Sequence, residues 1–132
     1  LSVVDSKTTH GESFVLVDGG TNVWGSDDRY FGMRAPLLSV VGGDGRPLAT
    51  ITVCGPLCTP FDRLAHRVVL PKLRDGDLLA IGCAGAYGIT AARPLLLSHR
   101  GAVELLLDHS EVAVIRERDG SVPSVPRWKA LS

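Results

Sequence analysis

Two cysteines, two prolines and a carboxylate lie close together in the stretch VCGPLCTPFD, positions 53–62. A thiol can bind a metal, act as a nucleophile or donate a proton, and the turn-forming residues around Cys58 would present its side chain from a loop. A zinc site needs a second closely spaced pair of ligands, which Cys83 and the four scattered histidines do not supply. A Cys-His hydrolase would need a histidine beside Cys58, which the sequence alone does not reveal. The alternative is a purely structural role, in which the stretch is a turn and Cys54 is a small buried side chain.

A second stretch with chemical potential is CAGAYG, positions 83–88. Gly85 and Gly88 allow a close backbone approach, so Tyr87 would be displayed from a tight loop and could donate to a phosphate or a carboxylate. The alternative is a tyrosine at a strand end with its hydroxyl in water. The glycine-rich stretches at 18–22 and 42–45 match neither common phosphate-binding signature and are interpreted as turns.

Composition limits the possible functions. The chain has 132 residues, a length that suits one domain. Its 14 basic and 14 acidic residues balance, so it has no electrostatic footprint for nucleic acid or an acidic membrane surface. No apolar run has the length of a membrane span. Three cysteines indicate a reducing, cytoplasmic compartment rather than a disulfide scaffold. The only methionine is Met33, so we expect a piece cut from a longer protein.

Short apolar or alternating segments separated by turn signals predict a mostly β chain, an antiparallel β-barrel or sandwich. The sequence divides into a β domain over 1–118 and a Pro- and Ser-rich extended tail over 119–132. The expected strands lie at 13–18, 36–41, 48–55, 77–83, 103–108 and 111–118.

Two local features refine this expectation. The loop at 42–47 has the form of a hairpin connection between its flanking strands. The stretch FDRLAHRVVLPKL is the one plausible helix, with Asp62 as its N-cap and Pro71 limiting its length.

Three segments in order, VCGPLCTPFDRLAHRVVLP, LRDGDLLAIGCAGAYGITAA and LLLSH, resemble the C-terminal domain of the pyridoxal-phosphate-dependent fold-type III decarboxylases, the ornithine, diaminopimelate and arginine decarboxylase family. The resemblance extends to about Asp108. The form Gly-Pro-Leu-Cys-Thr-Pro is similar to a branch that includes decarboxylases of antibiotic biosynthesis and others associated with exosortase systems.

This resemblance implies roles for several residues. Cys58 matches a cysteine that reaches into the partner subunit's active site and protonates the substrate carbon after carbon dioxide leaves. Tyr87 matches a tyrosine that hydrogen-bonds the cofactor phosphate. Thr59 stands where relatives carry an acidic residue that reads the distal end of the substrate. Because a neutral Thr cannot pair with a distal ammonium, we expect a substrate with a neutral or acidic distal group, or one tethered to a carrier protein as a thioester.

Two further substrate contacts are implied. Arg34 resembles an arginine that grips a substrate carboxylate, although Ala35 here separates it from the proline that usually follows. Asp62 either contacts the substrate or caps the adjacent turn.

The resemblance also implies what this chain lacks. The family holds pyridoxal 5'-phosphate through a lysine on an N-terminal (β/α)8 barrel, and none of the three lysines here lies in a matching motif. The chain alone is therefore expected to be inactive, and active only as part of a homodimeric parent enzyme acting on a small amino acid. No metal site is expected. The alternatives are a non-catalytic dimerisation or binding domain and a pyridoxal-phosphate-dependent racemase or epimerase.

Overall fold

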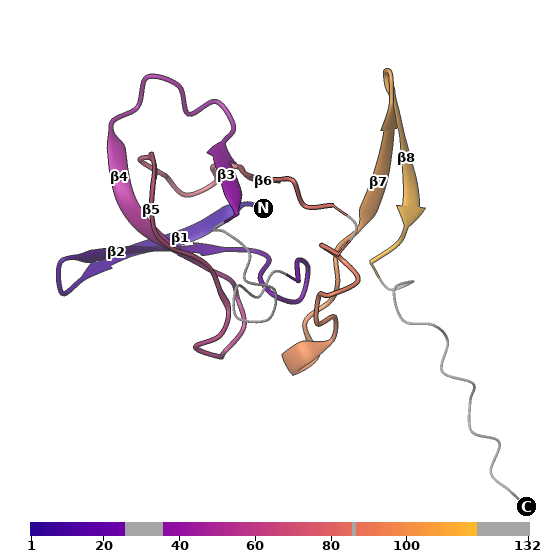
Figure 1. The fold of residues 1–132 in the computed structure, drawn as a ribbon, viewed down its shortest axis with the longest axis horizontal. Helices are drawn as coiled ribbons and strands as arrows, with labels where there is room; N and C mark the ends of the chain where they lie inside the picture. Colours follow the sequence, from indigo (N-terminus) through magenta and orange to yellow (C-terminus); the bar gives the residue numbers. More distant parts are fainter. Residues whose placement is uncertain (26–35, 86, 119–132) are drawn as a thin grey trace, which may run out of the picture.

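The computed structural model describes residues 1–25, 36–85 and 87–118 (Figure 1). These residues form eight strands and one short 3₁₀ helix, η1, at Leu96–Ser98. The strands are β1 (Val3–Thr9), β2 (Glu12–Val17), β3 (Leu37–Val40), β4 (Leu48–Cys54), β5 (Arg63–Pro71), β6 (Leu79–Gly82), β7 (Glu104–Asp108) and β8 (Glu111–Arg116).

The main sheet has four strands in the order β1-β2-β4-β5. β1 and β2 form an antiparallel hairpin whose turn residues, His10 and Gly11, both have positive φ, as a tight hairpin turn requires. β2 then runs parallel to β4, and β4 runs antiparallel to β5. The sheet therefore consists of two hairpins joined by the parallel pairing of β2 with β4, and the loop after β4 sits at one end of this sheet.

A second, two-stranded sheet of β3 and β6 covers the main sheet. Buried side chains from both sheets fill the space between them, whereas β1 contributes only Val3 to this layer. The core consists of Val3, Val15, Val17, Ile51, Val53, Leu64, Ala65, Leu70, Leu73 and Leu79, with Leu38 and Val40 packed against it. Burying each larger side chain contributes roughly 1.5–3 kcal/mol, so this layer holds the domain together.

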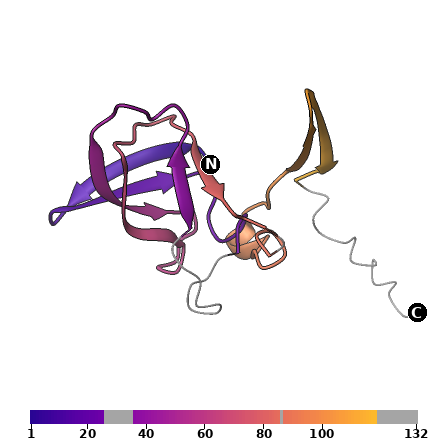
Figure 2. The same cartoon turned by 45° about the horizontal axis from the view of Figure 1, so that its top comes forward.

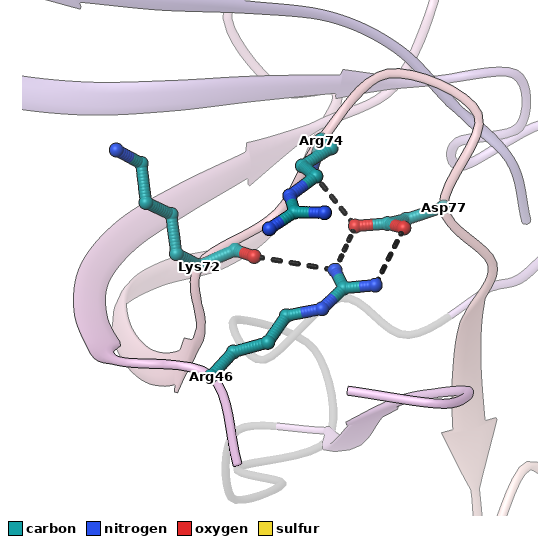
Figure 3. Close-up of polar contacts among 4 residues, drawn as sticks. All are labelled: Arg46, Lys72, Arg74 and Asp77. Carbon is teal, nitrogen blue, oxygen red and sulfur yellow. Dashed lines mark hydrogen bonds and ion pairs between the residues drawn. The ribbon is translucent and has the colours of Figure 1, made fainter. Parts of the chain in front are cut away.

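An ion pair joins two loops at one end of this core (Figure 3). Arg46 donates through Nη1 and Nη2 to the two oxygens of Asp77, at 2.5 and 3.2 Å. The backbone amide of Arg74 donates to the same carboxylate at 2.7 Å. The hydrogen bonds from Arg46, and then that from Arg74, hold the pKa of Asp77 below its ordinary value, and the pairing raises the pKa of Arg46.

The third sheet is the hairpin β7–β8, which stands apart from the other two sheets (Figures 1 and 2). Its apolar side chains point outward on both faces. Leu105, Leu106, Leu107, Val112, Val114 and Ile115 are each more than half exposed.

The prediction of a mostly β chain is confirmed in its sandwich form, while the described residues do not close into a barrel. Six expected strands are present, and β1 was not foreseen. The expected helix is wrong: this segment is β5, because β-branched Val68 and Val69 pair with β4 and the buried Leu64 and Leu70 join the core. The expected hairpin at 42–47 is also wrong, because β3 pairs with β6 and the loop crosses between sheets. The tail at 119–132 lies outside the described residues.

Candidate functional site

The loop at 55–62, which we call the cysteine loop, connects β4 to β5. Cys54 and Arg63 are paired across the two strands, so the loop is the connection of a hairpin. The amide of Gly55 donates to the carbonyl of Asp62 at 2.9 Å and closes the base of the loop. Its backbone is thereby fixed at both ends by the same core that holds the main sheet.

The carboxylate of Asp62 lies beneath the cysteine loop and is only 3% exposed. Its Oδ2 accepts a hydrogen bond from the amide of Leu57, and its Oδ1 accepts one from the amide of Thr21, each at 2.7 Å. The carboxylate occupies space left by two glycines. A Cβ added to Gly20 or Gly55 would lie 2.1 or 2.3 Å from an Asp62 oxygen.

The tip of the cysteine loop presents Cys58 to solvent. The amide of Thr59 donates to the carbonyl of Leu57 at 2.7 Å, and the amide of Asp62 donates to the carbonyl of Thr59 at 3.2 Å. The hydroxyl of Thr59 accepts from the amide of Phe61 at 3.3 Å. The thiol is therefore carried by a turn with several internal hydrogen bonds, and Phe61 is 55% exposed on the same turn.

The segment at 18–25, which we call the glycine segment, lies against the cysteine loop. The buried side chain of Asn22 accepts from the amide of Gly20 at 3.0 Å and donates to the carbonyl of Arg100 at 2.8 Å. Asn22 was not singled out from the sequence. Its position two residues after a Gly-Gly pair is the signal that could have indicated a side chain closing its own turn.

Tyr87 lies in a third segment, 84–93, and its side chain is 68% exposed. The amide of Gly88 donates to the carbonyl of Gly85 at 3.2 Å, and the amide of Ala91 donates to the carbonyl of Tyr87 at 3.0 Å. Gly88 has no room for a side chain, because an added Cβ would lie 2.3 Å from the carbonyl oxygen of Ala84. The turn is thus compact and presents the phenol outward.

The glycine segment connects the other two. The amide of Arg93 donates to the carbonyl of Thr21 at 2.8 Å, and the amide of Gly25 donates to the carbonyl of Gly88 at 2.6 Å. The structure therefore brings Cys58, Thr59 and Asp62 together on one loop. Tyr87 lies on another segment, and both the loop and that segment contact the glycine segment. Arg34 lies outside the described residues.

The three cysteines are free and differ in their surroundings. Cys58 and Cys83 are exposed, whereas Cys54 is partly buried at the end of β4. Burial raises the pKa of the Cys54 thiol above its ordinary value; nearby Arg63 opposes that shift and Asp62 adds to it. The raised pKa lowers the fraction of Cys54 present as thiolate, which is the form that acts as a nucleophile or a metal ligand.

A cavity of about 700 Å³ opens beside the glycine segment. Leu1, Trp24, Ile81 and Val103 form apolar parts of its wall, and His99, Arg100 and Arg118 form a basic part. A smaller cavity of about 260 Å³ adjoins it, lined in part by Asn22, Thr90 and Arg116. Neither is lined by Cys58 or Tyr87, so both predicted functional side chains project from loops rather than from these hollows.

The described residues contain neither a cluster of metal-binding side chains nor a helix that could span a membrane. No group of three or more histidine, cysteine, aspartate or glutamate side chains there could hold a metal ion. None of the helical structure in that part of the chain has the length and apolar character of a membrane span.

Residues 1–85 match the family model for the C-terminal sheet domain of pyridoxal-dependent decarboxylases. The chain is 35% identical over 122 residues to L-glutamyl-(BtrI acyl-carrier protein) decarboxylase of Niallia circulans, a match covering 88% of this chain and 28% of that protein. It is 40% identical over 94 residues to antizyme inhibitor 2 of Xenopus laevis, covering 69% of this chain and 21% of that protein.

Solved structures give the same result. Diaminopimelate decarboxylase from Helicobacter pylori, complexed with L-lysine, superposes with a TM-score of 0.74 and 31% identity, over 89% of this chain and 28% of that one. The chain spans less than a third of the length of these relatives. It belongs to the pyridoxal-dependent ornithine, diaminopimelate and arginine decarboxylase family, as the C-terminal sheet domain.

Proposed function

We propose that this chain is the C-terminal domain of a pyridoxal-phosphate-dependent amino-acid decarboxylase, and that it supplies Cys58 as a proton donor and Tyr87 as a phosphate contact at an active site shared across a homodimer. The observation that carries the proposal is the contrast between two thiols of one hairpin. Cys54 is partly buried at the end of β4, whereas Cys58 is exposed at the tip of a loop whose backbone is held by hydrogen bonds.

The residues of this chain fit part of a cofactor site. An exposed phenol on a compact turn suits a hydrogen bond to a phosphate oxygen. Of the lysines that the structure describes, Lys7, on β1, and Lys72, after β5, lie outside the cysteine loop and the segment of Tyr87, and Lys129 belongs to no matching sequence motif. The covalent attachment of pyridoxal phosphate is therefore proposed for the part of the relatives that this chain does not span, and the isolated chain is expected to be inactive.

The proposed reaction assigns separate roles to the cofactor, Cys58 and Tyr87. Pyridoxal phosphate, when bound, accommodates the electron pair left on the substrate carbon as carbon dioxide departs. The Cys58 thiol gives its proton to that carbon, forming the new C–H bond, and the resulting thiolate recovers a proton from solvent. The Tyr87 hydroxyl donates to the phosphate and fixes the orientation of the cofactor.

Substrate choice is proposed to depend on Thr59 beside the proton donor. A neutral hydroxyl offers no charge to a distal ammonium, so a neutral, acidic or carrier-tethered substrate fits. The name of the Niallia circulans relative, a decarboxylase of an L-glutamyl group on an acyl-carrier protein, supports a carrier-tethered substrate. Arg34 is proposed to bind the substrate carboxylate. Asp62 suits the turn-capping role better than a substrate contact, because its buried oxygens already accept two backbone amides.

The test is the Cys58→Ala variant of the full-length protein. We expect turnover to fall at least 100-fold, which is within the usual contribution of one general acid, with the remaining events protonating the wrong carbon. Cys83→Ala is the matched control, since Cys83 is also an exposed, free cysteine but lies outside the cysteine loop. Unchanged turnover and unchanged products in Cys58→Ala would overturn the assignment.

Tyr87 is tested separately by Tyr87→Phe, which removes only the hydroxyl. We expect a weaker affinity for pyridoxal phosphate, measured by equilibrium titration of the apo protein, with the fold retained. An unaltered dissociation constant would remove Tyr87 from the phosphate site. The proposed dimer is tested by light scattering of the full-length protein.

A non-catalytic binding domain is the second candidate function, because the Xenopus laevis relative is named as an inhibitor rather than as a decarboxylase. A full-length protein that releases no carbon dioxide from any amino acid and retains no cofactor would favour it. Racemisation or epimerisation is distinguished by product analysis, since it would yield the enantiomer or epimer and leave the carboxylate in place.

A further inference from the structure

We propose that Asp62 is a positioning residue whose buried carboxylate holds the loop of Cys58 and the segment of Tyr87 in a fixed relation. This inference rests on the proposed function. In this proposal Asp62 does not contact substrate or cofactor. It fixes the positions of Cys58 and Tyr87, which make those contacts.

Asp62 is hydrogen-bonded to the cysteine loop through both its side chain and its backbone. The Oδ2 atom of Asp62 accepts from the amide of Leu57, the residue directly before Cys58, at 2.7 Å. The backbone of Asp62 is bonded on both sides, through its amide to Thr59 and through its carbonyl to Gly55. One residue thus ties together the start, the middle and the end of the cysteine loop.

Asp62 is also connected to the segment of Tyr87, through the glycine segment. The Oδ1 atom of Asp62 accepts from the amide of Thr21 at 2.7 Å, across 41 positions of sequence. The carbonyl of Thr21 accepts from Arg93 at 2.8 Å, and Gly25 donates to Gly88, the residue directly after Tyr87, at 2.6 Å. The glycine segment is therefore bonded to Asp62 on one side and to the segment of Tyr87 on the other.

The space around the carboxylate fits this role. Gly20 and Gly55 crowd it so closely that neither position could carry even a methyl group. A carboxylate that is 3% exposed cannot reach a substrate in the solvent, and its burial is offset by the two amides aimed at it. Because each oxygen has a different segment as its donor, the side chain caps the cysteine loop and also connects it to the glycine segment.

Asp62→Asn in the full-length holoenzyme tests the proposal. Asparagine keeps the shape but replaces one acceptor oxygen with an NH2 group, which faces an amide donor and cannot accept from it. We expect kcat to fall at least tenfold while KM changes less than threefold, with a larger share of wrongly protonated product and a weaker affinity for pyridoxal phosphate. Asp77→Asn is the control. It removes another carboxylate that holds a backbone amide, but at the Arg46 ion pair, and it should leave kcat, KM and products unchanged.

A second readout does not depend on catalysis. We expect the rate at which a thiol reagent modifies Cys58, relative to Cys83 in the same molecule, to change at least threefold in Asp62→Asn and to stay constant in Asp77→Asn. A folded Asp62→Asn protein with unchanged kcat, products and Cys58 modification rate would overturn the proposal.

If Asp62→Asn does not fold, hydrogen exchange of the wild-type protein tests whether the carboxylate of Asp62 holds the two amides. The amides of Leu57 and Thr21, although in loops, should exchange at least 100-fold more slowly than unstructured peptide amides, and exchange at unprotected rates would contradict the proposal. The two hypotheses also fail separately. Activity that survives Cys58→Ala removes the proposed function, whereas activity that depends on Cys58 but not on Asp62 removes only the positioning role.

Discussion

Gly20 lies directly against the carboxylate of Asp62, so that a Cβ on this glycine would be 2.1 Å from Oδ1. Gly55 approaches the other oxygen in the same way, at 2.3 Å. The two glycines come from different turns, one after β2 and one after β4. At both positions the side chain of Asp62 leaves no room for a Cβ. The Gly-Gly pair at 19–20 and the Gly-Pro of the cysteine loop are therefore parts of one packing unit.

Gly20→Ala should destabilise the domain by about 2–4 kcal/mol, because the added methyl group overpacks the site and displaces a buried acceptor. The measurement is the free energy of unfolding from urea titration followed by circular dichroism. Gly42→Asn is the control: nothing lies within 4 Å of a Cβ at that position, and asparagine tolerates its positive φ. A Gly20→Ala protein as stable as the control would contradict the packing described here.

The strands that the sequence predicted well are those with a clear local pattern. The runs at 13–18 and 77–83 alternate or are continuously apolar, and both are strands with a buried face. β1 was not foreseen because only Val3 of its seven residues is buried, so its outer positions have the polarity of a loop. β5 was predicted to be a helix because Leu64, Ala65, Val68 and Val69 fit a helical face. Its pairing with β4 is a long-range interaction that local propensity does not encode.

Cys54 should react with iodoacetamide at least tenfold more slowly than Cys58 or Cys83 in the folded protein. Its burial limits access, and its raised pKa lowers the thiolate fraction near neutral pH. A timed labelling experiment read by peptide mass spectrometry measures the three rates. The difference should disappear in denaturant, and equal rates in the folded state would contradict the burial of Cys54.

Asp77→Asn should lower the urea midpoint of unfolding at pH 7, with an effect that shrinks as the solution is acidified. The pKa of Asp77 is lower in the folded state than in the unfolded state. Its stabilisation is therefore fully present above the ordinary carboxyl pKa of about 4 and is lost as pH falls through the lowered folded value. Unfolding midpoints of both proteins, measured in steps from pH 7 to pH 3, should converge at the acidic end.

Asp75→Asn provides the comparison, since Asp75 belongs to the same turn and is exposed. Its unfolding midpoint at pH 7 should match that of the wild-type protein. A constant gap between wild type and Asp77→Asn from pH 7 to pH 3 would show that the substitution acts through packing rather than through the charge.

Leu107→Thr combined with Val112→Thr should reduce self-association of the isolated chain. These residues are paired on neighbouring strands and are 70% and 63% exposed, within a larger apolar surface. Threonine keeps the preference for a strand while removing apolar area. Analytical ultracentrifugation over a range of concentrations measures the change.

The same replacement on the sandwich, Leu48→Thr with Val69→Thr, is the control, because those side chains are exposed to a similar extent but lie on other strands. It should change association less than the hairpin variant. An equal or larger effect would show that the hairpin is not the principal apolar surface of the isolated chain.

The placement of the candidate site residues was predictable from the sequence only where a single loop holds them. The exposure of Cys58 and Tyr87 follows from the Gly- and Pro-rich turns around them. The contact between Asp62 and Thr21 does not, because a hydrogen bond across 41 positions depends on the parallel pairing of β2 with β4. For the same reason, the expected helix made Asp62 an N-cap, whereas its actual donors come from two different loops.

The hairpin β7–β8 has a thermodynamic consequence for the whole domain. A two-stranded ribbon has no interior, so its folding free energy must come from a surface that it meets, and alone it is only marginally stable in water. Any surface that binds the folded ribbon then stabilises it in proportion to the logarithm of its concentration. Heat denaturation of the isolated chain would measure the stability of the two packed sheets. Protection of the amides at 104–116 from hydrogen exchange would instead measure how much of the hairpin is bound to another surface, and the two quantities would vary independently.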